Sequence, residues 1–506
     1  ATEIAKLRLF LKMMAVVEVD LRADNLGLDP LPDIDFNIRC GNTLVGYATE
    51  EELAKDFDNS SDFNQMWAND EFKDKLKTEM QLVATAYDTF KAVQFTQSED
   101  MATFKQAKRG LNERLDKLNE LLNRRMHAAT TSIPYEDWLI THQPFHWLAE
   151  FYQIIHDNGG FDVIIGNPPY VEYSKRNVKY QIGNYKTLKC SNLYAYIFER
   201  SFCIGKRDIG LIVQLSSIGT ESMKALQSFL INESEMIYYG CYPERPKQLF
   251  EGACIALSII LCQGKSVNLK DKCKMYGSGI SRCAESFRKY LFKSVGYISI
   301  DSSSFLPNYT LFPKFKEPIE QDICYKLLKN NTISKYLVPQ SENFIAYRTA
   351  GGRYWKIFIN RIFATKSTSN KIKFIRYELK TSLVSVLNSN LFWWYYVNYF
   401  DLYNLKDYMI FNFRYSDFAL NTLTELTHLG DQLMVSYENN KIVNQQYIRS
   451  KQQMSLFESF NPFKSKSIID EIDKVLAKHY GFTEEELDFI VNYDIKYRMG
   501  DELNEE

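Results

Sequence analysis

The sequence has few of the residues that mark metal-binding, disulfide-bonded or membrane-spanning proteins. Its 506 residues include only nine cysteines and six histidines. The cysteines form no Cys-x-x-Cys pair and the histidines have no ligand spacing, so we expect no metal site. Cys254 and Cys262 flank an apolar run and are interpreted as buried thiols of a reducing compartment. No apolar run is long enough to cross a membrane and no signal peptide is visible, so we expect no membrane partner.

Acidic and basic residues nearly balance, and the formal net charge of −2 does not by itself predict a nucleic-acid partner. Their distribution is uneven. Residues 263–296 contain eight Lys and Arg against two acids, residues 353–380 contain eight against one, and residues 483–506 contain nine acids against two cations. The two basic blocks are compatible with contacts to DNA phosphates, and equally with solvated faces of a globular protein.

The stretch on which our interpretation depends is residues 161–170. Phe161-Asp162-Val163-Ile164-Ile165-Gly166 is a short apolar run that predicts a buried strand of a parallel sheet. Pro168 and Pro169 have no N–H to donate to a ladder and a fixed φ, so the chain must leave the sheet at Asn167. Open α/β sheets bind ligands at the carboxyl ends of their strands, which makes this loop a candidate site.

The loop combines two hydrogen-bond acceptors with an aromatic ring. The side-chain amide of Asn167 and the carbonyl of Pro168 are held by a stiff backbone, and Tyr170 adds a flat face. An amino group on a planar base would donate its two N–H groups to these acceptors and stack on the ring. The acceptors favour a pyramidal nitrogen whose lone pair can attack, so they stabilise the transition state. The alternative is a plain strand followed by an Asn-Pro turn.

Ile165-Gly166-Asn167-Pro168-Pro169-Tyr170 resembles the catalytic motif of amino-group methyltransferases that use S-adenosylmethionine. With Pro144-Phe145-His146-Trp147 and Gly159-Gly160-Phe161-Asp162, the chain is similar to the adenine-N6 DNA methyltransferases of type IIG restriction–modification and related phage-defence systems. The resemblance implies methyl transfer to adenine N6 in a specific sequence of double-stranded DNA, in the bacterial cytoplasm. It implies Asn167, Pro168, Pro169 and Tyr170 as catalytic residues and allows a fused or separate endonuclease part.

The same resemblance implies a site for S-adenosylmethionine made by Asn42, Leu44, Asn167 and Ile197. Asn42 would bond the cofactor's adenine amino group, Leu44 would line the adenine face and Ile197 would pack on it. A Gly-Asn turn and ordinary core packing are the alternatives for these residues. No Gly-x-Gly loop lies near Ala1. We therefore expect the sequence to be part of a longer protein, and these residues alone to bind the cofactor poorly.

Three further residues are implied in DNA recognition. Phe250 would stack on an extruded target base opposite Tyr170, or would simply be a core residue at a strand edge. Arg348 and Arg353 lie in a segment that mixes basic, aromatic and turn residues, and we expect them to contact phosphates or bases. Phe392 to Tyr396 are predicted to be core, because a run of large aromatic residues is costly to expose.

The predicted fold class is α/β. We expect a Rossmann-like, mostly parallel methyltransferase sheet that lacks its first strand or strands, with a helical insertion, followed by an α+β target-recognition domain. The apolar runs that predict strands are 161–166, 209–215 and 253–262. The predicted divisions are residues 1–264 for the catalytic domain with the insertion at 51–135, residues 265–450 for recognition, and a helical segment at 451–506.

Two local patterns predict helices in these segments. In the insertion, Leu111, Leu115, Leu118 and Leu122 repeat at four, three and four and predict a short seam between two helices. Near the end of the sequence, residues 464–478 predict a helix, Gly481 its stop and Thr483 the cap of a new helix.

Two other functions stay open. The Asn-Pro-Pro-Tyr motif also serves enzymes that methylate a glutamine amide in a protein or an amino group in RNA, although the long segment after Phe250 argues against these usually compact enzymes. The absence of the glycine loop would also fit a non-catalytic subunit that only recognises DNA.

Overall fold

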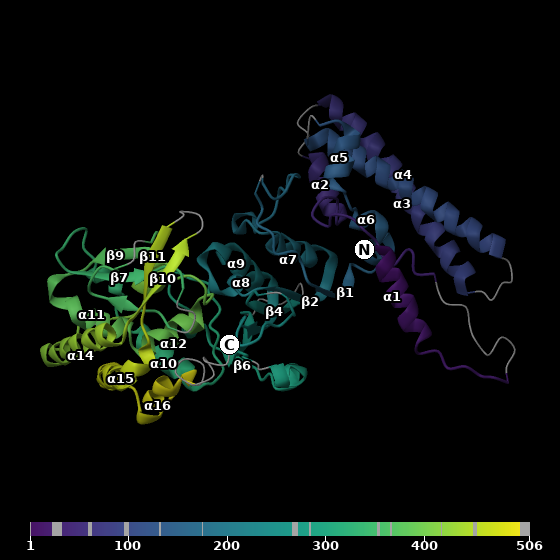
Figure 1. Ribbon diagram of the computed structural model, residues 1–506. Coiled ribbons are helices and arrows are strands. Elements are labelled where there is room, and N and C mark those ends of the chain that lie inside the picture. The colour runs from purple at the N-terminus through teal and green to yellow at the C-terminus, as the bar shows by residue number, and fades with distance from the viewer. Residues whose placement is uncertain are drawn as a thin grey trace. The chain divides into compact units, whose positions relative to one another are not determined.

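The computed structural model describes residues 2–22, 33–58, 63–95, 101–130, 133–174, 176–252, 254–265, 272–282, 285–351, 355–364, 367–415, 417–448 and 453–495 (Figure 1). By its internal contacts the chain divides into two units, and each is described by itself. Unit 1 comprises Ala1–Leu211, Glu233–Glu235 and Leu261–Lys270. Unit 2 comprises Ile212–Asn232, Met236–Ile260 and Asp271–Glu506. The domain boundaries at residues 264 and 450 remain predictions.

Unit 1 is largely helical. Its elements are α1 (Thr2–Met14), α2 (Glu50–Asp58), α3 (Phe63–Phe95), α4 (Met101–Thr130), α5 (Tyr135–His142), α6 (Trp147–Glu150), β1 (Phe161–Gly166), α7 (Leu193–Ile204) and the first part of β2 (Gly205–Gln214). The long helices α3 and α4 pack against each other through the leucine seam that the sequence predicted. Leu111, Leu115, Leu118 and Leu122 are all at most 4% exposed and share a cluster with Leu76 of α3.

Strand β1 pairs in parallel with β2, with Ile164 opposite Ile209 and Gly166 opposite Leu211. The strand and its parallel partner confirm the prediction, but its burial was predicted wrongly. Val163 is 60% and Ile165 is 81% exposed, because both point to one face of β1 that the described residues leave largely uncovered. An apolar run predicts a strand whose side chains can be buried, but they are buried only where another layer covers that face of the strand.

The strands β1 to β6 are ordered β1-β2-β4-β3-β5-β6. The Leu215 N–H, after β2, donates to the Ala256 carbonyl just before β4 (Leu257–Gly264), and the Lys265 N–H, after β4, donates to the Glu233 carbonyl just before β3 (Ser234–Tyr242). Strand β4 therefore runs opposite to β2 and β3. The strand predicted at 253–262 exists as β4. The sheet is mixed: β1, β2, β3 and β5 run in one direction, and β4 and β6 run against them.

Unit 2 contains the remaining elements. Besides most of β3 and the first half of β4 these are α8 (Ser216–Gly219), α9 (Lys224–Glu233), β5 (Lys274–Ile280), β6 (Ile298–Ile300), α10 (Ile319–Leu328), β7 (Phe344–Arg348), β8 (Phe358–Ile359), β9 (Asn370–Phe374), α11 (Lys380–Leu387), α12 (Asn390–Tyr399), α13 (Asp407–Phe411), α14 (Leu420–Asn440), β10 (Ile442–Ile448), β11 (Gln453–Ser459), α15 (Lys466–Tyr480) and α16 (Glu484–Asn492). β3 pairs in parallel with β5, and β7 pairs antiparallel with both β8 and β9.

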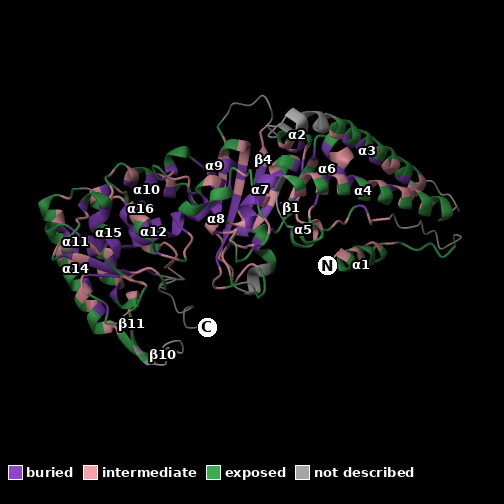
Figure 2. Ribbon diagram, turned by 90° about the horizontal axis from the view of Figure 1, so that it is seen from above, coloured by how far each residue is buried: buried purple, intermediate pink, exposed green. Residues whose placement is uncertain are grey.

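Helix α12 is the centre of the unit 2 core. Every one of its residues is buried, which confirms the core predicted at Phe392 to Tyr396 (Figure 2). Trp394 stacks on Phe315 with ring centroids 5.8 Å apart. At the start of the helix, the buried carboxylate of Asp473 accepts the backbone N–H groups of Asn390 and Leu391 at 2.9 and 3.0 Å. A negative charge at a helix N-terminus is favourable, so α15 both packs on α12 and caps it.

A second buried carboxylate, Glu320 of α10, supports the same core. It accepts the indole N–H of Trp394 at 2.9 Å and the backbone N–H groups of Lys316 and Glu317 at 2.7 and 3.1 Å. Burial raises the pKa of Glu320 from 4.5 to about 7, against the lowering effect of these hydrogen bonds. Between about pH 4.5 and 7, Glu320 is therefore protonated in the folded protein and already ionised in the unfolded chain.

We expect the free energy of unfolding to fall as pH rises from about 4.5 to 7, by up to about 1.4 kcal/mol per pH unit from this group. Glu320→Gln, which keeps an acceptor for Trp394, should remove that part of the slope. Urea unfolding across this range measures it. Glu425→Gln, at an exposed position on α14, is the control and should leave the slope unchanged. Identical slopes in wild type and Glu320→Gln would contradict the assignment.

Candidate active site

The end of β1 places the predicted catalytic residues. The last paired residue of β1 is Gly166, and the chain then leaves the ladder at Asn167 as the two prolines require. Asn167 is exposed, Pro168 is buried and Tyr170 is half-buried. The buried proline anchors the loop while the Asn167 amide stays accessible to a ligand.

Asn167 and Tyr170 are in direct contact. The Tyr170 hydroxyl donates a hydrogen bond to Asn167 Oδ1 at 2.6 Å. The Tyr170 ring meets Tyr194 of α7 edge to face, with centroids 6.3 Å apart and an interplanar angle of 79°. Tyr194 is fully buried, so it provides a rigid support for Tyr170. The acceptor that the sequence assigned to a substrate amine thus already accepts one hydrogen bond, from the tyrosine hydroxyl.

The chain after Tyr170 is attached to the start of α7. The Leu193 N–H donates to the Val171 carbonyl at 3.0 Å, and the Tyr173 N–H donates to the Ser191 carbonyl at 2.9 Å. Asn192 between them caps α7 through the Tyr194 N–H. These bonds close a loop of residues 174–190, and they fix Tyr170 relative to the helix that carries Tyr194.

Glu199 of α7 holds the far side of this loop. Its buried carboxylate accepts the backbone N–H groups of Lys186 and Thr187, each at 2.9 Å, and the Thr187 hydroxyl at 2.9 Å. A buried carboxylate with three donors is well satisfied, and it leaves the loop little freedom near residue 187. The sequence carried no signal for this role, because a Glu within an amphipathic helix is ordinarily a solvent-facing residue.

The predicted cofactor residue Asn42 lies in a loop held by the Pro144–Trp147 segment. Its N–H donates to the Gln143 carbonyl at 2.7 Å, and its side-chain oxygen accepts the Leu44 N–H at 3.2 Å. Burial raises the pKa of Tyr180, in the loop described above, and the nearby Asn42 side chain lowers it. Leu44 is 6% exposed and Ile197 is half-buried. Tyr180 is a contact of the candidate adenine site that sequence reasoning did not identify.

His146 fixes this loop as a neutral ring. Complete burial and the nearby Arg200 lower its pKa to about 3. Its Nδ1 accepts the Tyr47 N–H at 3.0 Å and its Nε2 lies 3.0 Å from Asn123 Oδ1, so the proton belongs on Nε2. The Pro-Phe-His-Trp segment therefore acts in this structure as a brace for the Asn42 loop.

The remaining predicted residues belong to unit 2 or to undescribed positions. Phe250 follows β3 and is 39% exposed. The Arg348 guanidinium packs over the Phe363 ring at 4.4 Å and donates to the Glu458 carbonyl at 2.9 Å. Arg353 lies outside the described residues. Within the described ranges no cluster of His, Cys, Asp or Glu could hold a metal, and no helix could span a membrane.

Glu199→Ala should leave the backbone N–H groups of Lys186 and Thr187 without the carboxylate that accepts them. Each backbone N–H left buried without an acceptor costs about 1–3 kcal/mol, so the loop should open more often. Hydrogen exchange at Lys186 and Thr187 is expected to accelerate at least tenfold. Glu233→Ala is the matched control, because Glu233 contacts the same loop only through the exposed ammonium of Lys186 at 2.8 Å. Unchanged protection in Glu199→Ala would show that Glu199 does not hold the loop.

Comparison with known proteins agrees with the motif. Residues 1–242 match the profile of the family described as Eco57I restriction-modification methylase. A Methanocaldococcus jannaschii protein, named as a candidate type II restriction enzyme and methyltransferase, is 26% identical over 369 residues. That match covers 63% of this chain and only 29% of the relative, so the chain spans under a third of the relative's length.

Solved structures of restriction–modification enzymes are also similar to the chain, at low TM-scores. The type IIL enzyme MmeI, solved in complex with DNA, has a TM-score of 0.36 at 12% identity, covering 86% of this chain and 78% of that one. The type ISP enzyme LlaGI, a nuclease-deletion mutant solved with a DNA substrate mimic, has 0.35 at 10%, covering 72% and 52%. Scores of this size do not decide the fold. The sequence match is limited to the first part of the chain, where residues 1–242 resemble the Eco57I restriction-modification methylase family.

Proposed function

We propose that this chain is the methyltransferase part of a restriction–modification or phage-defence enzyme, and that it methylates the N6 amino group of adenine in a specific sequence of double-stranded DNA. The observation that carries the proposal is the Asn167-Pro168-Pro169-Tyr170 loop at the carboxyl end of β1, with an exposed amide beside a supported tyrosine ring. The family match of residues 1–242 supports it.

In this proposal the loop binds an extruded adenine. The amino group of the base displaces the Tyr170 hydroxyl from Asn167 Oδ1 and donates one N–H there and the other to the Pro168 carbonyl. The base stacks on the Tyr170 ring, which Tyr194 supports from behind. As the nitrogen takes on positive charge, the two acceptors would stabilise that charge through its N–H groups, and the excess proton would be lost to solvent.

S-adenosylmethionine would supply an electrophilic methyl group when bound. The donor set of this chain fits only the adenine end of such a cofactor: the Asn42 amide lies in a braced loop beside Tyr180, and Ile197 is half-buried on α7. The sequence contains no glycine loop near Ala1 that would hold the methionine end. We therefore assign only contacts at the adenine end, by Asn42 and Ile197, to the described residues.

DNA binding is assigned to unit 2, and the phosphate contacts to its basic blocks. Arg361 of the block at 353–380 pairs with Glu438 and Glu458, and Lys373 pairs with Asp407. Several cations of that block are thus already engaged within the unit. Arg348 likewise contacts Phe363 and Glu458, so we no longer propose that it contacts DNA directly.

Asn167→Ala should reduce methyl transfer by about a hundredfold to a thousandfold, because one of the two charge-stabilising acceptors is lost. Asn167→Asp keeps an acceptor and should retain more activity than Asn167→Ala. The measurement is single-turnover methyl transfer to duplex DNA by the full-length protein, with 2-aminopurine fluorescence at the target position to report base extrusion.

Tyr170 provides the controls for this experiment. Tyr170→Phe removes the hydroxyl that donates to Asn167 but keeps the ring, and should stay close to wild type. Tyr170→Ala removes a stacking face worth about 1–3 kcal/mol and should weaken extrusion of the base. Full methylation by Asn167→Ala, or an inactive but folded Tyr170→Phe, would refute the proposed mechanism.

A further inference from the structure

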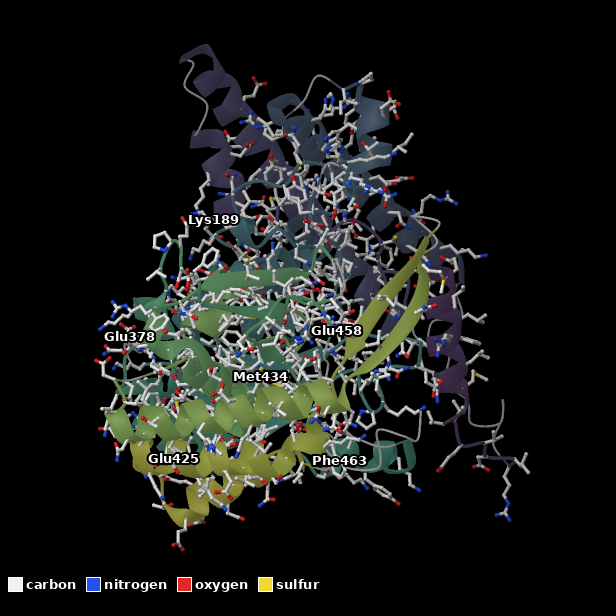
Figure 3. The ribbon with its side chains drawn as sticks, turned by 60° about the vertical axis from the view of Figure 1, so that its left-hand side comes forward. Lys189, Glu378, Glu425, Met434, Glu458 and Phe463 are labelled. Atoms are coloured by element: carbon white, nitrogen blue, oxygen red, sulfur yellow. The ribbon has the colours of Figure 1, made fainter. Side chains whose placement is uncertain are left out.

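The ribbon of β10 and β11 is the one two-stranded sheet among the described residues, and it extends away from α14 and α15 (Figure 3). Ile442 and Val443 point to opposite faces of β10, and they are 54% and 51% exposed. On β11, Met454 is 57% and Leu456 is 49% exposed. A ribbon this short is at best marginally stable in water by itself. Its order must therefore come from its base and from whatever it binds.

The base of the ribbon is held by a buried carboxylate. Glu458, near the end of β11, is 1% exposed and accepts the Ala364 N–H at 2.7 Å and the Arg361 guanidinium at 3.0 and 3.3 Å. The Glu458 backbone carbonyl accepts Arg348 at 2.9 Å. Figure 3 shows Glu458 where the ribbon joins the rest of the unit. Two arginines and a carboxylate thus fix the direction in which the ribbon leaves the unit.

One face of the ribbon combines an amide with apolar side chains. The register places Gln445 opposite Leu456, Val443 opposite Glu458 and Tyr447 opposite Met454, so Val443, Gln445, Met454 and Leu456 share a face. Gln445, like its neighbour Asn444, is exposed. Residues 441–457 contain three cations and no Asp or Glu. The acid of this face, Glu458, is turned inward and paired.

We propose that this face enters the major groove of the DNA and reads an A·T pair outside the methylated adenine, with Gln445 bound to the adenine and Leu456 or Met454 against a thymine methyl. The proposal rests on the proposed function for the identity of the partner. A major groove admits a two-stranded ribbon, glutamine binds adenine N6 and N7 together, and apolar groups contact the thymine methyl. Residues 441–457 carry no acid and Glu458 is buried, so the ribbon can lie between two phosphate backbones.

Arg348, Arg361 and Glu458 are positioning residues in this arrangement. They do not touch the DNA, but they set the angle at which the ribbon meets it. This accounts for an arginine in a basic and aromatic segment whose guanidinium is committed to a ring and a backbone carbonyl.

The test determines which DNA motif the full-length protein methylates. The motif is read by single-molecule sequencing of DNA from cells that express the protein. Gln445→Ala should relax the preference for A·T at one position of the motif by roughly 5- to 150-fold, with the methylation rate at the original motif less affected. Gln432→Ala, an exposed glutamine on α14, is the matched control and should leave the motif unchanged. An unchanged motif in Gln445→Ala would overturn the ribbon's role while leaving the proposed function intact.

A second measurement tests whether the ribbon contacts DNA even if the wild-type protein methylates no DNA. A photo-crosslinking amino acid at position 443 should attach to random duplex DNA, and the yield should fall in Glu458→Gln, where the base of the ribbon loses its ion pair. Crosslinks only to a second copy of the chain or to another protein would show that the ribbon is a protein-docking strand pair, and would overturn the proposal. Loss of methylation together with DNA crosslinking would refute the proposed function and retain the ribbon as a DNA contact.

Discussion

The candidate site depends on two prolines that cannot join a β-ladder. Gly166 is the last residue of β1 to pair with β2, and the chain cannot extend that pairing because Pro168 and Pro169 lack an N–H. The covalent structure of the two prolines therefore determines where the strand ends. It leaves the Asn167 amide at the carboxyl end of a parallel strand, while the burial of Pro168 keeps the loop from moving freely. The attachment of residues 171 and 173 to the start of α7 then brings Tyr170 over Tyr194.

Three buried carboxylates hold backbone segments in defined positions in this structure. Glu199 collects the backbone N–H groups of the loop beside the site, Asp473 collects those at the start of α12, and Glu458 collects an amide and a guanidinium at the base of the ribbon. A charge taken out of water is tolerated only when several donors surround it, so each carboxylate imposes a defined position on the segments that supply the donors. These carboxylates orient the segments around them more than they stabilise the fold.

Local sequence was sufficient where a residue's own chemistry decides its conformation. The end of the chain illustrates this. A helix, a glycine stop and a new helix capped by Thr483 were predicted, and the structure has α15 ending at Gly481 with φ of 70° and α16 starting with a Thr483–Glu486 capping box. The strand and turn at residues 161–170, the leucine seam of α4 and the aromatic core of α12 were predicted for the same reason. Periodicity and proline act within a few residues and need no distant partner.

Other features were decided only by the tertiary structure, because they depend on which residue lies on the other side of a contact. The sequence alone placed the Asn167 amide directly after a parallel strand, and the structure has it there. It could not show that β1 is an end strand, that β4 runs against its neighbours, or that β3 exists between two predicted strands. Nor could it show that Arg348, chosen for its charge, is bound to Phe363 and Glu458 from segments far along the chain. A side chain's charge and size are local properties, whereas its partner is chosen by the packing of the whole unit.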